Sequence, residues 1–113
     1  MQYIFEKREI DVGKDILDCI FEPEEKNELT LKTKSGVDID FIIADIMFNV
    51  NNNNIEKEIL SIHCALALKE EINTIFIFKV VTENDKSFIV QEQDENIAKA
   101  VFEEFKKRVA ECD

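Results

Sequence analysis

The chain has 113 residues, of which 45% are hydrophobic and nine are Phe, with only two Gly and one Pro. This size and composition fit one domain, residues 1–113, with a core of its own, and they argue against a disordered chain. Twenty-five acidic residues against 14 basic ones give a net charge of −11. Such a field repels phosphates and anionic lipid headgroups, so we expect neither nucleic acid nor a membrane as a partner.

The cysteines and the first residues of the chain indicate the cellular compartment. Cys19, Cys64 and Cys112 form no C-x-x-C pair, and the chain has one histidine, so we expect no structural zinc. Widely spaced cysteines in odd number suit the reduced thiols of the cytoplasm. The opening residues, MQYIFEKREID, lack the apolar core of a signal peptide. We therefore expect a soluble, cytoplasmic protein.

Two strands are expected before the first loop. Residues 3–12 mix apolar and charged positions, which indicates a partly exposed strand. Residues 15–21, DILDCIF, are apolar on both parities, which favours a buried strand. The polar run 22–27 around Pro23 then predicts a loop, because proline cannot donate to a β-ladder.

The pattern from residue 29 to residue 43 predicts a β-hairpin. Apolar and polar residues alternate on both sides of Ser35-Gly36, and a glycine supplies the positive φ that a tight turn needs. Asp38 and Asp40 should then lie on the outward face, within reach of lysines on the partner strand.

Residues 55–70 allow two interpretations. A helix would place Ile55, Ile59, Ile62 and Leu66 on one stripe, whereas a strand from about residue 59 would place every second apolar residue on one face. We favour the strand. The alternative fold is an antiparallel sheet with two helices, residues 55–70 and 94–111.

The last third of the chain predicts two strands and a helix. Residues 75–81 are apolar on both parities, which is typical of a central strand covered on two sides, and residues 87–91 follow after a polar turn. Asp94 can cap the helix that follows. Its apolar residues recur every fourth position and should pack on the sheet: Ile97, Val101, Phe105 and Val109.

The segment IFIFKVVTENDKSFIVQEQDENIAKAVFEEF, residues 75–105, resembles the end of a pleckstrin-homology or phosphotyrosine-binding domain. The resemblance covers the C-terminal half of the chain and implies a fold only, because no lipid or phosphotyrosine motif accompanies it. Together with the strand pattern it predicts an α+β, mainly antiparallel fold. We expect a bent sheet or partly open barrel of about six to seven strands, with one C-terminal helix at the open end.

No pattern in the chain indicates catalysis or a bound cofactor. His63 is the single histidine and, beside Cys64 in a strand, would point to the opposite face, so we expect a structural histidine. Asp38, Asp40 and Asp45 lack a calcium-loop pattern. We therefore expect a non-enzymatic protein without a metal or cofactor.

Two functions of different kinds remain. Acidic side chains concentrate in the loop and hairpin and form the candidate contact surface for a basic protein: Glu22, Glu24, Glu25, Glu28, Asp38 and Asp40. The first hypothesis is an inhibitor or immunity protein that neutralises a nuclease or toxin through this surface. The alternative is an adaptor that binds an extended peptide at a sheet edge, in a groove between the strand of residues 59–68 and the C-terminal helix.

Overall fold

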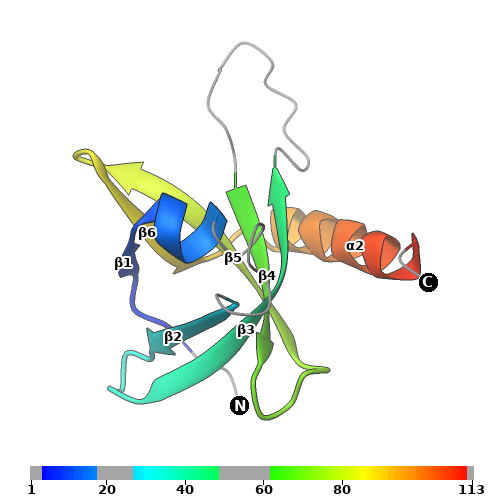
Figure 1. The fold of residues 1–113 in the computed structure, drawn as a ribbon, viewed down its shortest axis with the longest axis horizontal. Coiled ribbons are helices and arrows are strands. Elements are labelled where there is room, and N and C mark those ends of the chain that lie inside the picture. The colour runs from blue at the N-terminus through cyan, green and yellow to red at the C-terminus, as the bar shows by residue number, and fades with distance from the viewer. Residues whose placement is uncertain (1–3, 18–26, 49–61, 112–113) are drawn as a thin grey trace.

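The computed structural model describes residues 4–17, 27–48 and 62–111 (Figure 1). These residues contain six strands, one short π-helix and one long α-helix. The elements in chain order are β1 (Arg8–Ile10), η1 (Val12–Leu17), β2 (Glu28–Lys32), β3 (Asp38–Phe48), β4 (Ile62–Leu68), β5 (Ile75–Glu83), β6 (Lys86–Gln91) and α2 (Glu95–Glu111).

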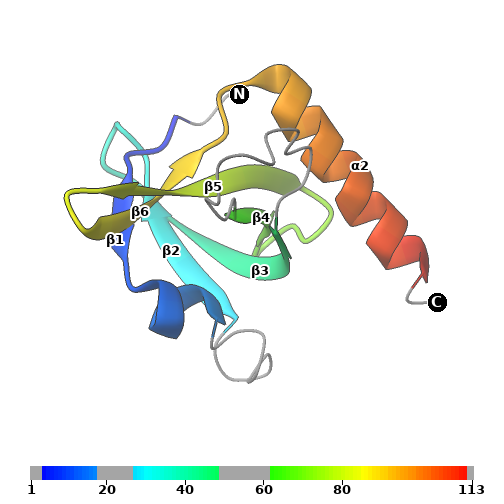
Figure 2. The same ribbon diagram turned by 90° about the horizontal axis from the view of Figure 1, so that it is seen from above.

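The strands form one antiparallel sheet that curls into a nearly closed barrel (Figures 1 and 2). Its order is β1-β6-β5-β4-β3-β2, so β1 and β2 are the two edges. A bridge between Phe5 and Thr33 brings these edges together. The Glu6 amide donates to the Lys32 carbonyl over 2.9 Å beside it. The predicted mainly antiparallel α+β fold is confirmed.

The barrel interior is filled mainly by aliphatic side chains and a group of aromatic rings. Phe5, Phe41, Phe76 and Phe78 meet edge to face, with ring centroids 5.4 to 5.9 Å apart. Such pairs add to the free energy gained by burying the rings. Ile16 of η1 is also fully buried among the residues of this core.

The predicted hairpin is confirmed. Leu31 pairs with Ile39 across β2 and β3, and Gly36 in the turn has φ of 92°. The inward residues Leu29, Leu31 and Phe41 are buried. Asp38 lies opposite Lys32 on the outward face, and their charged groups are 3.9 Å apart.

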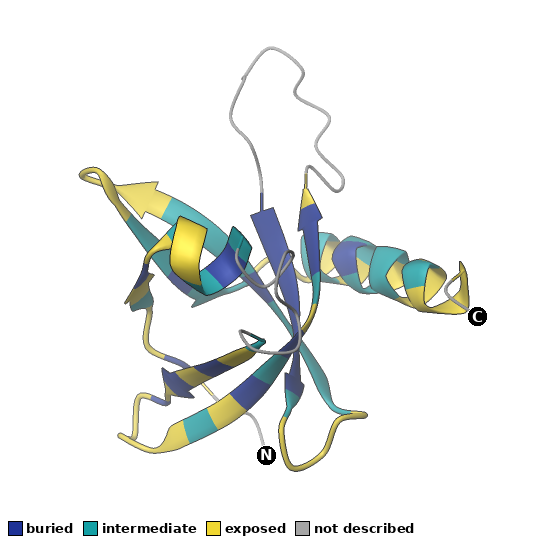
Figure 3. Cartoon of the chain, in the orientation of Figure 1, coloured by how far each residue is buried: buried dark blue, intermediate teal, exposed yellow. Residues whose placement is uncertain are grey.

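Residues 62–68 form a strand, as we favoured, and the helix interpretation is wrong for this part of the chain. Residues 55–61 lie outside the described residues. Both faces of β4 are buried (Figure 3). Cys64 and Leu66 belong to the barrel core, while Ala65 packs with Val101 of α2. Burial on both faces explains the uninterrupted apolar and alanine-rich sequence.

Residues 75–81 are covered on both sides, as expected. In β5, Phe76, Phe78 and Val80 pack in the barrel core, and Ile75 and Ile77 pack in the cluster that contains Val101 of α2. Phe78 is buried and its neighbours from Ile75 to Val81 are half-buried, so β5 is covered less completely than β4.

The strand predicted for residues 15–21 is wrong in the described part, which is η1; residues 18–21 lie outside the described residues. Reciprocal hydrogen bonds start this turn: the Lys14 amide donates to Asp11 Oδ1 over 3.1 Å, and the Asp11 amide donates to Asp15 Oδ2 over 2.8 Å. This arrangement resembles a capping box. The prediction of a strand considered only which positions are apolar and overlooked the signal of the two aspartates.

The C-terminal helix begins as predicted. Asp94 Oδ1 accepts the amides of Asn96 at 2.9 Å and Ile97 at 3.3 Å, which makes Asp94 the N-cap. Ile97, Val101 and Phe105 pack against Met47 and Ala65. Val109 is 50% exposed, so its predicted contact is wrong: the last turns of α2 extend beyond the sheet (Figure 1).

The position of α2 follows from the alternation along β4. Ala65 faces away from the barrel core, and α2 covers this outer side of β4 and β5. The resemblance implied instead a helix at the open end of the barrel.

Among the described residues, no helix is long and apolar enough to cross a membrane.

Candidate functional site

The outward side of the β2–β3 hairpin carries a charged surface that we call the hairpin face. Period-two alternation turns these side chains outward while Leu29, Leu31 and Phe41 turn inward. The segment that follows β4 adds two more charged groups, because the main-chain amide of Lys69 donates to the Asp40 carbonyl over 3.0 Å. The hairpin face comprises Glu28, Thr30, Lys32, Asp38, Asp40, Lys69 and Glu70.

Polar contacts hold the carboxylates of this face in place. Lys69 Nζ lies 2.8 Å from Glu28 Oε1, and the Thr30 hydroxyl donates to Asp40 Oδ1 over 2.7 Å. The hydrogen bond to Glu28 and its negative charge raise the pKa of Lys69, so this amine stays protonated. Four carboxylates are therefore set against two ammonium groups, and the face keeps an excess of negative charge.

A hollow of about 530 Å³ opens in the hairpin face, where β3 and the end of β4 diverge. We call it the acidic hollow. Half-buried Ile39 and Leu68 contribute apolar surface, and three carboxylates and one ammonium group contribute charge. Its lining residues are Asp38, Ile39, Asp40, Leu68, Lys69 and Glu70.

Three of the six predicted contact residues lie together on this face: Glu28, Asp38 and Asp40. The other three, Glu22, Glu24 and Glu25, lie outside the described residues. Sequence reasoning missed Lys69 and Glu70. Their only signal was the polar run KEE after the strand, and the pairing of β3 with β4 is what brings them beside Asp40.

A second polar constellation lies beneath the start of α2. His63 Nε2 is 2.9 Å from Glu92 Oε1, and the two side chains are only 6% and 2% exposed. Glu92 Oε2 accepts the Asp94 amide at 3.2 Å and lies 3.5 Å from Lys79 Nζ. This pair ties β4 to the segment that enters the helix. The burial expected for His63 is confirmed.

The carboxyl of Glu92 is ionised in spite of its burial. Burial alone would raise its pKa, but the hydrogen bonds from His63 and the Asp94 amide, together with the charge of Lys79, outweigh this effect and lower it. Glu92 stands in the polar run QEQDE, residues 91–95, which gives no sign of a buried carboxylate. The contact with His63 depends on the order β4-β5-β6, which the sequence does not display.

The described residues bear on two further kinds of site, a metal site and a groove for an extended peptide. Within the described ranges, no group of three or more His, Cys, Asp or Glu side chains could hold a metal ion. Asp45 contacts Arg108 of α2 at 3.4 Å. The peptide groove expected between residues 59–68 and the C-terminal helix is wrong for β4, because β3 and β5 pair with both of its edges and Ala65 packs in one cluster with Val101 of α2.

Comparisons with known proteins give no match. No family model fits the chain, and no curated protein and no solved structure is similar to it. Any statement about function therefore depends on the residues of this chain.

Proposed function

We propose that this chain is a non-enzymatic acidic protein that binds a basic surface of another protein and neutralises it, as an inhibitor or immunity protein neutralises a nuclease or toxin. The observation that carries the proposal is the acidic hollow, where Asp38, Asp40 and Glu70 surround a partly apolar space of about 530 Å³. We infer a cytoplasmic setting from the sequence.

The chemistry of the hollow suits a lysine or arginine side chain from the partner. The aliphatic stem of such a side chain would contact Ile39 and Leu68, and its charged end would meet the carboxylates. Arginine anchors of this kind are frequent at the energetic centres of protein interfaces. The hollow thus supports recognition of a basic protein in particular.

The charge of the whole chain supports the same proposal. A net charge of −11 on 113 residues gives a long-range attraction for a basic partner and accelerates encounter. Nuclease clefts are basic because they hold phosphates, so carboxylates compete well for them.

Charge reversal tests which surface is used. The partner would be captured on the immobilised chain from lysate of the source organism at low salt, then purified. Replacing Asp38, Asp40 and Glu70 together by lysine should weaken binding to that partner by roughly 10- to 100-fold, since each rim charge contributes up to about 1 kcal/mol and reversal adds repulsion. Isothermal titration calorimetry measures the change.

The matched control reverses three exposed carboxylates of α2, Glu95, Glu103 and Glu111. It changes the net charge equally but leaves the hairpin face intact, so affinity should fall only a few-fold through the lost long-range attraction. Equal losses in both variants would contradict the assignment of the acidic hollow as the contact site. Urea unfolding of both variants confirms that they are folded.

A further inference from the structure

The barrel is not closed along its whole length, because its two edge strands separate. Near the Phe5–Thr33 bridge the edges are joined: the Lys34 amide donates to the Ile4 carbonyl, and the Glu6 amide donates to the Lys32 carbonyl, both over 2.9 Å. Continuing the same antiparallel register places Arg8 opposite Thr30. The next main-chain pair should form there.

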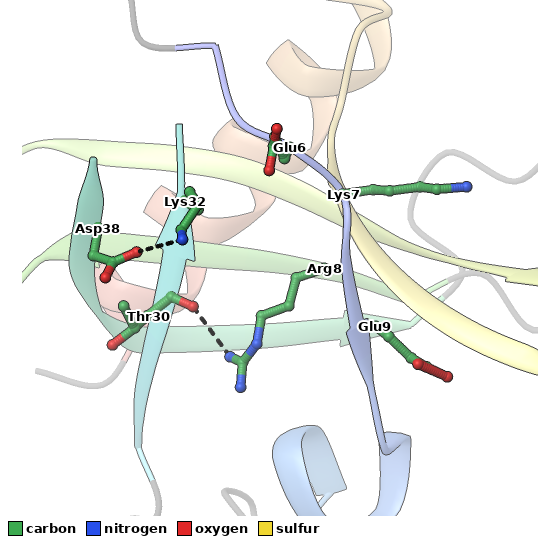
Figure 4. A pocket seen from close by; sticks show the side chains of 7 residues that line it. All are labelled: Glu6, Lys7, Arg8, Glu9, Thr30, Lys32 and Asp38. Carbon is green, nitrogen blue, oxygen red and sulfur yellow. Dashed lines mark hydrogen bonds and ion pairs between the residues drawn. The ribbon is translucent and has the colours of Figure 1, made fainter. Parts of the chain in front are cut away.

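Between Arg8 and Thr30, a side-chain hydrogen bond stands where a main-chain hydrogen bond between the strands would be expected. Arg8 Nη1 donates to the Thr30 carbonyl over 3.2 Å, and among the described residues β1 pairs only with β6 and β2 only with β3 (Figure 4). Paired strands lie about 4.8 Å apart, whereas here the guanidinium bridges a wider opening. This opening, which we call the seam, encloses about 370 Å³.

Among the described residues, no strand pairs with the side of β2 that faces the seam. The Thr33 amide donates to the Val37 carbonyl and the Ile43 amide to the Asn27 carbonyl, so the odd-numbered residues of this strand bond to β3. Alternation then turns the main-chain groups of Glu28 and Thr30 toward the seam. The bonds from Arg8 to Thr30 and from Glu6 to Lys32 agree with this parity.

Charge around the seam indicates what could enter it. Glu6, Glu9 and Asp38 line the opening. Three cations line it as well, Lys7, Arg8 and Lys32, so the lining is balanced in charge while Arg8 holds Thr30. Lys7 lies 2.9 Å from Glu83, Lys32 lies 3.9 Å from Asp38, and Glu9 lies 3.8 Å from Lys86. If Arg8 swings away from Thr30, the lining loses one cation, and the seam presents main-chain acceptors and donors beside three carboxylates and two lysines on a chain with a net charge of −11.

We infer that an extended, basic segment of the partner enters the seam and adds to β2 as an antiparallel strand, displacing the Arg8 guanidinium from the Thr30 carbonyl. Addition of a strand to an open edge gives main-chain hydrogen bonds that do not depend on sequence, and flanking charges select the segment. This inference rests on the proposed function, because it describes how the same basic partner is held. The added strand would run parallel to β1.

The probe is the heptapeptide acetyl-Lys-Val-Lys-Val-Lys-Val-Lys-amide, followed by hydrogen exchange measured by NMR on the intact chain. Saturating peptide should slow exchange of the Thr30 and Glu28 amides by about tenfold or more, because these groups become hydrogen-bonded. The amide of Leu31, which faces β3, should change little. The same peptide with glutamate in place of lysine should give no protection.

Two variants at one position separate the main chain from the side chain. Thr30→Pro removes the N–H that faces the seam without removing a β2–β3 ladder bond, and should lower affinity about fivefold or more. Thr30→Val loses the same hydroxyl bond to Asp40 but keeps the N–H, so the affinity that Thr30→Pro loses beyond Thr30→Val belongs to the N–H. Arg8→Ala should bind several-fold more tightly, since no side chain competes for the Thr30 carbonyl.

Three results would overturn the inference. The first is an unprotected Thr30 amide at saturating peptide, and the second is equal protection by the glutamate peptide. The third is protection without peptide that grows with protein concentration, which would make a second copy of the chain the occupant. If Thr30→Pro does not fold, a peptide with N-methylated valines replaces it and should give no protection. Failure here leaves the proposed function intact, since that depends on reversing Asp38, Asp40 and Glu70.

Discussion

The most consequential single residue outside the hairpin face is Glu92. Its carboxylate is nearly inaccessible, yet three donors, His63, the Asp94 amide and Lys79, surround it. Removing one member of a buried hydrogen-bonded pair leaves an unsatisfied group, which costs more than the pair gains over water. We interpret the pair as a structural tie between β4 and α2.

Glu92→Gln should reduce the free energy of unfolding by about 1–3 kcal/mol at pH 7. The pKa of Glu92 is lowered from its ordinary value of 4.5 in the folded chain. The folded state therefore favours the charged form, and this contribution is complete above pH 4.5 and is lost as pH falls through the lower folded pKa. Urea unfolding at pH 7 and at successively lower pH should show the difference from wild type shrinking.

The control is Glu83→Gln, which removes a carboxylate that is 53% exposed and paired with Lys7. Its cost should stay below about 1 kcal/mol. A loss for Glu92→Gln that matches this control, or that is the same at every pH, would show that the buried carboxylate carries no special stability.

At this scale the sequence predicted His63 as buried but not its partner. The apolar neighbours of His63 indicate burial directly. Glu92 lies in a run of charged and amide side chains, which is typical of an exposed segment, and only the pairing of β4, β5 and β6 brings its side chain against His63. Contacts between distant residues have no local signature.

Elements with strict alternation were predictable, and a short irregular turn was not. The hairpin follows period two because one of its faces is buried, and in β4 the larger apolar residues fall on every second position even though both faces are buried. η1 is six residues long and is set by Asp11 and Asp15. Over so few residues, counting apolar side chains at odd and even positions cannot distinguish such a turn from a short strand.

The helix stripe gives a matched pair of substitutions. Val101 is fully buried between α2 and the sheet, whereas Val109 is half exposed. Val101→Ala should lower the free energy of unfolding by about 1–3 kcal/mol, because two methyl groups leave a packed site. Val109→Ala should change it by no more than about 0.5 kcal/mol. Thermal and urea unfolding measure both, and equal effects would contradict the packing of α2 described above.

The whole molecule combines a local and a non-local part. Strands β2 to β6 are neighbours in chain order, so successive turns explain their arrangement. The pairing of β1 with β6 joins strands that are far apart in the sequence, and no sequence pattern predicts it. The acidic hollow and the seam both lie where adjacent strands diverge, which is why the predicted acidic residues were recoverable but their surroundings were not.

The central claim is that negative charge on a rigid barrel recognises a basic protein. The most direct test is the affinity for the captured partner measured in NaCl from about 0.05 to 0.5 M, with rates from surface plasmon resonance. We predict that affinity falls about tenfold or more, mainly through slower association. An affinity that stays constant or rises with salt would contradict the claim.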